Sequence, residues 1–580
     1  MSGDSITLLE GGLPVASIIK KKKKGRNYYY AVQSKRVDGE PRIVWQKYLG
    51  TLDRILERVD ASEPPGPKET VLFEAGGVAA LLQMVNRLNL VELIDEIVPK
   101  RDQGPSVGQY MVLAALNRAL APRSKSRIGD WYESTILRRL WGMPETAFTS
   151  QRFWDHMDMI GEEEINLIQE RLLDRIGAEI GLDTEVLLYD TTNFFTFIAS
   201  TNVRSTLARR GRNKQKRNDL RQVGLSVIAS QKFQVPLMHS VYEGNCNDLT
   251  LFPKVVKSLQ QRYSRILQKN TDTTLICDKG CFGEEALETL AVGGVHFVCS
   301  LPSTYFSETF TISIDQLKPL AEPPGTRVAS YPLELWSKEC QLVLCYSENL
   351  YTTQLDSITR QMVKCQKSLA DLQKSLHRRA TEGGRGKRPT VGSVRAKVRK
   401  ILSGQYLDEI IKTKVKVKKK GAIPTLQYEV DHDALQQINT HRLGRTLLVT
   451  DRLDWKPRRV VEAYHSLARI EDAFKDMKNT EFLQWQPAFH WTDQKLRVHG
   501  FYCVLALTLV RLVRKIAWEN GIKLSVAALL EELSDIKEVA MVYPKHYKKG
   551  GDNRLTHSRM SRRQLKLAKA LEIGQITAWG

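Results

Sequence analysis

Two short apolar runs that each end on an aspartate constrain this chain more than any other feature. The first reads VLLYD and ends at Asp190, and the second reads TLICD and ends at Asp278. Runs of this length and composition predict buried β-strands. If both strands belong to one sheet, they can bring the two carboxylates to a shared divalent cation, because Mg²⁺ prefers hard oxygen ligands. Taken alone, Asp190 is more simply interpreted as a turn or cap residue.

A third acid lies in the segment YHSLARIEDAFKDMK. Tyr464, Glu471 and Lys478 follow one another at a spacing of seven, which predicts one shared face of a long helix around 458–479. Glu471 can complete a metal site on that face, while Tyr464 and Lys478 can hold phosphate oxygens. The simpler alternative is a surface helix with a Glu–Lys pair, and it would be preferred if the two strand aspartates were absent.

The chain carries a large excess of positive charge. It has 87 Lys and Arg against 65 Asp and Glu in 580 residues, a formal net charge of +22. An excess of this size indicates a polyanionic partner, with nucleic acid as the first candidate and a merely soluble basic protein as the alternative. The basic segments are spread along the chain, as a protein that wraps DNA requires, and predict binding that weakens steeply with salt. They are 20–26, 204–217, 378–400 and 412–420.

Cysteines and apolar segments bear on the compartment. The 8 cysteines form no CxxC pair and have no histidine partners at zinc spacing, which favours free thiols in a reducing compartment. The apolar segment before Lys20 is too short for a cleavable signal. An apolar helix near 501–513 is interrupted by Arg511 and is expected to be too short to span a bilayer. We therefore expect a soluble, intracellular protein without a membrane partner.

Changes in sequence texture predict several domains. Apolar residues at helical spacing dominate 69–180, whereas strand-like runs at 185–189, 223–230 and 235–243 precede alternating helices and strands. This order predicts an α/β fold built on a mixed sheet with helical cover. The predicted units are a basic arm with a β-hairpin (1–62), a helical DNA-binding domain (69–180), a first core part (181–305), an insertion of β segments and a basic helical hairpin (306–440), a second core part (441–515) and a C-terminal helical region that either dimerises or packs on the core (516–580).

The three acids sit within longer stretches of recognisable sequence. YDTTNF, EGNCND, CDKG and Y-x6-E-x6-K occur in this order, and RLGRTLLVTD (442–451) and QPAFHWTDQKLRVHGFYCVLAL (486–507) flank the third acid. Together they resemble the DDE transposases of bacterial insertion sequences, in the group marked by a Tyr-Arg-Glu-Lys signature. The likeness runs from about 180 to 515, in the family's order.

This resemblance implies an RNase H-like catalytic core in which Asp190, Asp278 and Glu471 bind two Mg²⁺ ions, for which Mn²⁺ could substitute. The family's insertion between the second acid and the glutamate corresponds to 306–440. Contacts to DNA are expected from the residues around the acids, namely Tyr464, Lys478, Arg469, Lys279, Arg209, Arg210, Arg212, Lys214 and Arg217.

The sequence departs from the family pattern at the signature arginine. Leu467 stands at that position, and the nearest cation is Arg469, two residues later. Ala468 stands where relatives often carry a tryptophan used at the flipped terminal base. These departures concern the grip on phosphate and base, and leave the three acids in place.

The implied function is a transposase that binds the terminal inverted repeats of its insertion sequence, cleaves DNA by metal-dependent hydrolysis and joins the 3′-hydroxyl ends to target DNA. Paired ends need at least two protomers, so we expect a homodimer on DNA, in the bacterial cytoplasm and associated with the nucleoid. Two alternatives stay open: an RNase H-like nuclease without joining activity, and a catalytically silent, transposase-derived DNA-binding protein. A tyrosine recombinase fits less well, because no Arg/His/Arg set matches.

Overall fold

The computed structural model describes residues 17–577 apart from 38–39, 61–66, 102, 214, 216, 270–271, 303–304, 384–385, 418, 420, 487 and 544–553. The chain divides into two compact units. The smaller consists of residues 1–73 and 538–557, and the larger of residues 74–537 and 558–580.

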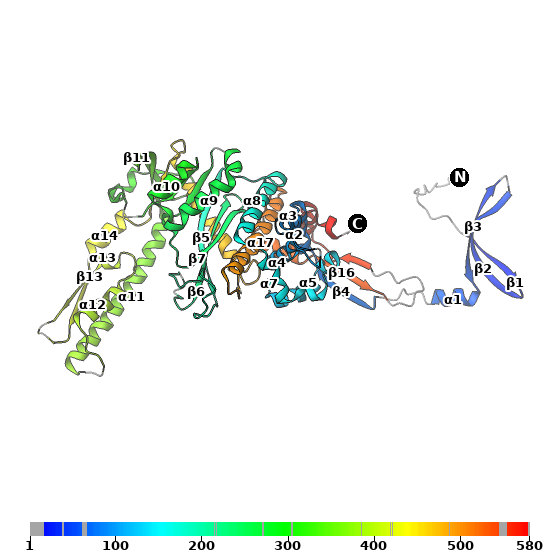
Figure 1. The fold of residues 1–580 in the computed structure, drawn as a ribbon, viewed down its shortest axis with the longest axis horizontal. Helices are drawn as coiled ribbons and strands as arrows, with labels where there is room; N and C mark the ends of the chain where they lie inside the picture. Colours follow the sequence, from blue (N-terminus) through cyan, green and yellow to red (C-terminus); the bar gives the residue numbers. More distant parts are fainter. Residues whose placement is uncertain are drawn as a thin grey trace, which may run out of the picture. The chain divides into compact units, whose positions relative to one another are not determined.

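The smaller unit contains two three-stranded sheets (Figure 1). In one, β1 (Ser17–Lys23), β2 (Arg26–Val37) and β3 (Glu40–Gly50) pair antiparallel and are followed by helix α1 (Leu52–Asp60). The lysine run predicted to form an arm therefore lies largely within strand β1. In the other, β4 (Glu69–Glu74) lies beside β16 (Lys537–Val542), which pairs with β17 (Arg554–His557). The helical prediction for 516–580 is wrong at these two strands, which pair with each other, while β16 also lies beside β4, more than 460 residues earlier.

A nine-stranded mixed sheet forms the centre of the larger unit, in the order β10-β11-β12-β15-β9-β8-β5-β6-β7. Strands β5, β8 and β9 run parallel, and every other neighbouring pair is antiparallel. The predicted mixed α/β sheet with helical cover is confirmed. The bounds are β5 (Val186–Thr196), β6 (Arg221–Ser230), β7 (Pro236–Glu243), β8 (Thr274–Cys277), β9 (His296–Ser300), β10 (Lys318–Pro319), β11 (Thr326–Leu335), β12 (Lys338–Ser347) and β15 (Arg445–Thr450).

The two faces of this sheet are covered by different helices. Because side chains alternate along a strand, Leu187 and Tyr189 of β5 share one face. They pack in a buried cluster with residues of α9 (Asp248–Lys269) and α10 (Glu284–Val292). The opposite face, which carries Asp190, meets α15 (Pro457–His465), α16 (Ala468–Asp476) and α17 (Asp493–Glu519).

The region predicted to be helical, 69–180, begins with strand β4 and is helical from Gly76 onward. Its helices are α2 (Gly76–Arg87), α3 (Leu90–Ile97), α4 (Val107–Leu120), α5 (Ile128–Glu133), α6 (Leu137–Trp141), α7 (Ser150–Asp158) and α8 (Glu162–Glu179). Thr135 separates α5 from α6, because its hydroxyl donates to the Tyr132 carbonyl and accepts from the Leu137 amide.

The inserted segment is divided between two cores. Its β segments, β10 to β12, extend the central sheet instead of standing apart from it. A separate core begins at the long helix α11 (Glu348–Thr381) and includes α12 (Val391–Ile401), α13 (Leu407–Ile410), β13 (Ile411–Lys416), β14 (Thr425–Val430) and α14 (His432–His441). One side of α11 packs in this core, where Ile358, Cys365, Leu369 and Leu376 are buried.

Helix α17 is longer than the sequence pattern predicts. It spans 27 residues and, by length and composition, could cross a membrane. However, 94% of the apolar 18-residue stretch within this helix is buried inside the fold, which is typical of a core helix. Helices α2 and α3, which meet at a bend of 54°, are together also long and apolar enough to cross a membrane. The expectation of a helix too short to span a bilayer is therefore wrong.

A buried polar cluster joins α17 to the helical region. Lys125 donates to the Tyr502 hydroxyl and lies 3.3 Å from His490 Nε2, and His490 lies 3.2 Å from His499. None of the described members hydrogen-bonds to a carboxylate. Burial lowers the pKa values of Lys125, His490 and His499 well below their usual ranges. These groups therefore favour their neutral forms in the fold.

Acidification should weaken this part of the molecule. Burial also lowers the pKa of His239 to about 3. The unfolded chain binds protons at these three histidines below about pH 6.5 and the folded chain does not, so stability is lost as pH falls. The expected loss is about 1.4 kcal/mol per histidine between about pH 7.5 and 5.5. Amide hydrogen exchange in α17, compared between about pH 7.5 and 5.5 after correction for intrinsic rates, measures it.

The matched variants are His239→Leu, which removes one buried titrating group, and His432→Gln, which removes an exposed one. The first should flatten the pH dependence and the second should leave it unchanged. Equal slopes in wild type and His239→Leu would contradict the assignment.

Candidate active site

Asp190 and Asp278 lie level with each other on neighbouring parallel strands. Leu188 of β5 pairs with Ile276 of β8, and the same register continued by two residues sets Asp190 beside Asp278. Asp190 lies within β5, which continues to Thr196, and not at the strand's end as predicted. Strand β8 does end directly before Asp278. The two carboxylates therefore project from one face where the parallel pairing stops.

Several hydrogen bonds hold the two acids. Asp190 Oδ1 accepts from the Thr191 amide at 2.7 Å, and Asp278 Oδ1 accepts from Ser300 Oγ at 2.9 Å. Ser300 Oγ in turn accepts from the Lys279 amide at 3.0 Å. On the opposite face, Thr191 Oγ1 donates to Asp248 at 3.0 Å and ties β5 to the start of α9. Sequence reasoning did not assign roles to Ser300 and Asp248, although Asp248 closes the EGNCND segment.

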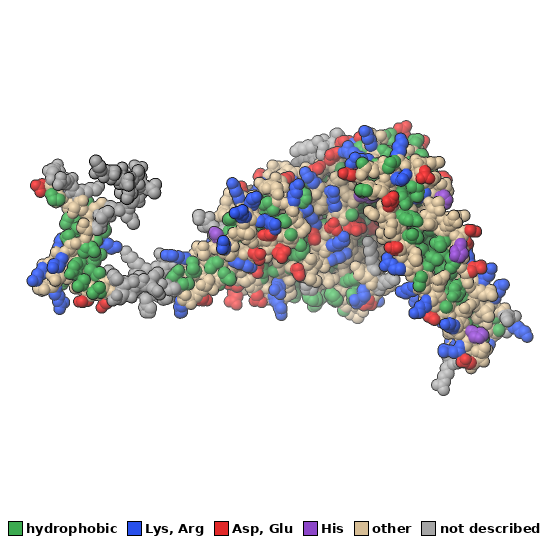
Figure 2. Space-filling model, turned by 180° about the vertical axis from the view of Figure 1, so that it is seen from behind, with side chains coloured by type: hydrophobic (Ala, Val, Ile, Leu, Met, Phe, Trp, Pro, Cys, Tyr) green, Lys and Arg blue, Asp and Glu red, His purple; other side chains and the backbone are tan. Residues whose placement is uncertain are grey.

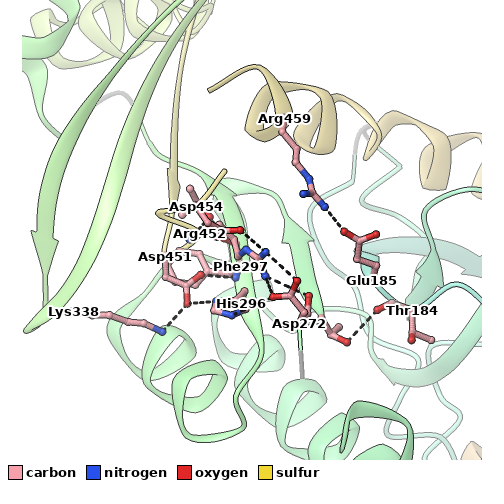
Figure 3. A network of polar contacts seen from close by, with 12 residues as sticks. Thr184, Glu185, Asp272, His296, Phe297, Lys338, Asp451, Arg452, Asp454 and Arg459 are labelled. Atoms are coloured by element: carbon pink, nitrogen blue, oxygen red, sulfur yellow. Dashed lines mark hydrogen bonds and ion pairs between the residues drawn. The ribbon is translucent and has the colours of Figure 1, made fainter. Parts of the chain in front are cut away.

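Helix α15 contacts the residue that follows β8 and the residue that precedes β5. Tyr464 donates its hydroxyl to Asp278 Oδ1 at 3.2 Å. Burial raises the pKa of Tyr464 above its usual range, which keeps this donor protonated. Five residues earlier, Arg459 forms an ion pair with Glu185, just before β5 (Figure 3). The helix therefore lies along the sheet with its tyrosine directed at the second aspartate.

The strand ends remote from Asp278 are fixed by a further polar network (Figure 3). Arg452 is buried and forms ion pairs with Asp272, which precedes β8, and with Asp454. Asp451 accepts from the Phe297 amide and pairs with Lys338 at 2.9 Å. These bonds join β8, β9, β12 and β15, so they set the register from which Asp278 emerges.

The predicted single helix over 458–479 is two helices, so that prediction is wrong. Ser466 and Leu467 separate α15 from α16. The Ser466 hydroxyl donates to the Ala463 carbonyl at 2.5 Å and accepts from Gln231 at 3.0 Å, which favours a local turn over a continuing helix. Leu467, at the signature arginine position, is buried.

Lys478 nevertheless reaches the sheet as its spacing predicts. Its Nζ donates to Thr192 Oγ1 at 2.6 Å, two residues beyond Asp190, and lies 5.5 Å from the centre of the Phe194 ring. Lys478 itself lies two residues after the end of α16. Glu471, on the exposed side of α16, thus lies between two residues that both contact the acid-bearing strands. The contacts of Tyr464 and Lys478, before and after Glu471 in the sequence, are the strongest link between Glu471 and the two aspartates.

The three acids do not close around a common point. Among the residues that the structure describes, no three His, Cys, Asp or Glu side chains are placed so that they could hold a metal ion. Asp190 and Asp278 supply suitable oxygen donors for a divalent cation, whereas Glu471 stands outside that pair.

The predicted basic contacts are distributed between two places. Arg209, Arg210, Arg212 and Arg217 are exposed in the basic loop (residues 204–217) between β5 and β6, and Lys214 lies outside the described residues. Arg217 pairs with Asp219 at 2.8 Å. Lys279 is exposed directly after Asp278.

Arg469 is not brought to the two aspartates. It lines a separate cavity of about 600 Å³ together with Arg511, Arg514 and Trp518. The proposed contact of Arg469 with DNA stays a prediction.

Comparison with known proteins decides the family. Residues 195–508, more than half of the chain, match the model described as "Transposase DDE domain". The chain belongs to this transposase family. The match to the DDE transposase domain includes Asp278 and Glu471 and begins five residues after Asp190. The placement of Asp190 rests instead on the register of β5 with β8.

The remaining comparisons are distant. No curated protein matches the sequence. One solved structure with a partial likeness is "Cryo-EM structure of piggyBac transposase synaptic complex with hairpin DNA (SNHP)". It shows 10% sequence identity and a TM-score of 0.36, over 79% of this chain and 78% of that one. Members of the DDE transposase family generally use divalent metal ions.

Proposed function

We propose that this DDE transposase binds the terminal inverted repeats of a bacterial insertion sequence, hydrolyses DNA at those ends and joins the 3′-hydroxyls to target DNA. The observation that carries the proposal is the register of β5 with β8, which sets Asp190 beside Asp278, in a chain of this family. The central sheet then corresponds to an RNase H-like core of the Tyr-Arg-Glu-Lys group, with Leu467 in place of the arginine.

Asp190 and Asp278 would hold divalent ions, and Glu471 would complete the site for two Mg²⁺. Bound Mg²⁺ stabilises the charge that develops on attacking and leaving oxygens during phosphodiester cleavage. The chain's own residues orient the substrate. Tyr464 and Lys478 flank the acids and offer a hydroxyl and an ammonium to phosphate oxygens.

DNA binding follows from the charge distribution. Lysine and arginine side chains are spread over much of the face shown in Figure 2, including the region of α11 and α12. A net charge of +22 over such a surface favours contact with the DNA backbone. We also propose a homodimer on paired ends and a location in the bacterial cytoplasm, at the nucleoid.

A cleavage and joining assay tests the proposal. Purified protein is incubated with labelled duplexes that carry the ends of the DNA flanking its gene, with Mg²⁺, with Mn²⁺ or with a chelator. We expect metal-dependent nicks at the repeat ends and joined products from pre-cut ends with free 3′-hydroxyls. Nicks without joined products would indicate the nuclease alternative, and end binding without nicks would indicate a silent DNA-binding protein.

A further inference from the structure

One carboxylate, Asp493, accepts four hydrogen bonds from the beginning of the basic loop. Oδ1 accepts from Ser205 Oγ at 2.8 Å and from the Leu207 amide at 3.0 Å. Oδ2 accepts from the amide and the hydroxyl of Thr206 at 3.0 and 2.5 Å. Partial burial alone would raise the pKa of Asp493, but the bonds from Thr206, Leu207 and Ser205 outweigh it and lower that pKa. The side chain is thus an ionised acceptor with both oxygens satisfied.

Asp493 is the first residue of α17, and the next residues of that turn hold a different part of the chain. Gln494 donates to the Met157 and Ile160 carbonyls at the end of α7. Lys495 pairs with Asp158 at 2.7 Å, and Arg497 pairs with Glu162 at 3.0 Å. The first turn of α17 therefore fixes the basic loop to the helical region.

The loop's arginines follow directly after the anchored residues. Arg209 exchanges two backbone hydrogen bonds with Gln222 at the start of β6, at 3.0 and 2.8 Å. Gly244 lies four residues before Asp248, and its amide donates to the Leu207 carbonyl at 3.0 Å. The loop backbone is thus held on one side by Asp493 and on the other by the strands next to Asp190. Arg204, Arg209, Arg210 and Arg212 keep exposed side chains on this fixed backbone.

We infer that Asp493 is a positioning residue that holds the basic loop in the shape in which its arginines contact DNA phosphates. Asp493 carries a negative charge and would not touch the DNA itself. Its effect acts through the loop, because arginines on an ordered backbone lose less conformational freedom when they bind. This inference rests on the proposed DNA-binding function.

Limited proteolysis tests whether Asp493 holds the loop. In the full-length Asp493→Ala protein, tryptic cleavage after Arg209, Arg210 or Arg212, mapped by mass spectrometry, should be roughly 10-fold faster than in wild type, because cleavage follows the open population of a segment. Asp493→Asn retains one acceptor oxygen and should give an intermediate rate. Asp158→Ala removes the same charge from the opposite side of the turn and should leave loop cleavage unchanged. Equal loop cleavage in wild type and Asp493→Ala overturns the inference.

DNA binding tests what the ordered loop does. With a terminal-repeat duplex, Asp493→Ala should bind about tenfold more weakly despite its higher net charge, and its salt dependence should fall by about one unit for each phosphate that the loop no longer neutralises. Thr206→Val, which removes one of the four donors, should shift affinity in the same direction by a smaller factor. Faster loop cleavage with unchanged affinity and salt dependence overturns the role in DNA binding. If wild type binds no DNA, the proposed function fails and this role fails with it, while proteolysis still decides whether Asp493 holds the loop.

Discussion

Replacing Asp190 or Asp278 with asparagine should lower the rate of DNA cleavage by roughly 10³-fold or more and leave DNA binding largely intact. Each aspartate contributes charge at the place where a cation would stabilise the transition state, a contribution of several kcal/mol at about 1.4 kcal/mol per factor of ten. Asparagine keeps the shape and removes the charge. Single-turnover cleavage of a labelled repeat end, beside a binding titration of the same duplex, measures both quantities.

Two comparisons separate a shared site from a general loss of charge. Asp315→Asn removes the same charge from an exposed position between β9 and β10 and should cleave at the wild-type rate. The double variant of Asp190 and Asp278 should be no slower than the slower single variant, since groups that act as a unit are not additive.

Metal substitution adds a chemical test. Asp278→Cys should be inactive with Mg²⁺ and regain part of its rate with Mn²⁺, because thiolate is a poor ligand for the harder ion. Cleavage at the wild-type rate by either asparagine variant would remove these aspartates from the site. A double variant whose loss is the product of the two single losses would show that they act separately.

The acid-bearing strands could be predicted because their information is local. Four-residue β8 and the strand before Asp190 are continuous apolar runs, and buried parallel strands of an α/β sheet have this composition. The spacing of seven also grouped Tyr464 with Lys478, and the structure places the first on Asp278 and the second on Thr192, although the helix between them is interrupted.

What could not be predicted depends on partners distant in the sequence. The turn at Ser466 is fixed by Gln231, 235 residues earlier. Strand β16 lies between β17 and β4, and β4 is more than 460 residues earlier in the chain. Asp493 resembles any helix-start aspartate, and its four donors lie 286–288 residues away. The same holds for Asp248, whose local pattern marks a helix start and whose contact is Thr191.

The largest expected effect on stability is at Arg511, in the middle of α17. Its side chain is 4% exposed, and its Nη2 forms an ion pair with Asp476 Oδ2 at 2.6 Å. Its Nη1 donates to Gln234 at 3.2 Å. Asp476 is the last residue of α16, the helix that bears Glu471 and leads to Lys478. This pair therefore holds the helix of the third acid against the core.

Arg511→Met should destabilise the packing of α16 on α17 by about 2–3 kcal/mol, less than the loss from a fully buried pair, because it leaves a partly buried carboxylate without its partner. Since the chain has two units, one global unfolding transition is not expected, and hydrogen exchange of α16 and α17 amides is the suitable measurement. Arg514→Met, on the same helix, removes a half-buried arginine that donates to the Leu524 carbonyl and lies over Trp518. It should cost only about 1 kcal/mol, the usual net value of a hydrogen bond.

The ionisation of Asp476 makes the effect of Arg511→Met depend on pH, which provides the most specific test of this prediction. Burial raises the pKa of Asp476 even beside Arg511, which partly offsets it, and loss of the arginine should raise that pKa further. A carboxyl whose folded pKa is raised stabilises the fold at low pH and loses this contribution as pH rises through the folded pKa. The deficit of Arg511→Met relative to wild type should therefore shrink between about pH 7.5 and 5, and the double variant Arg511→Met/Asp476→Leu should recover most of the loss. A deficit that is independent of pH and is not reduced in the double variant would show that Arg511 stabilises α17 by packing alone.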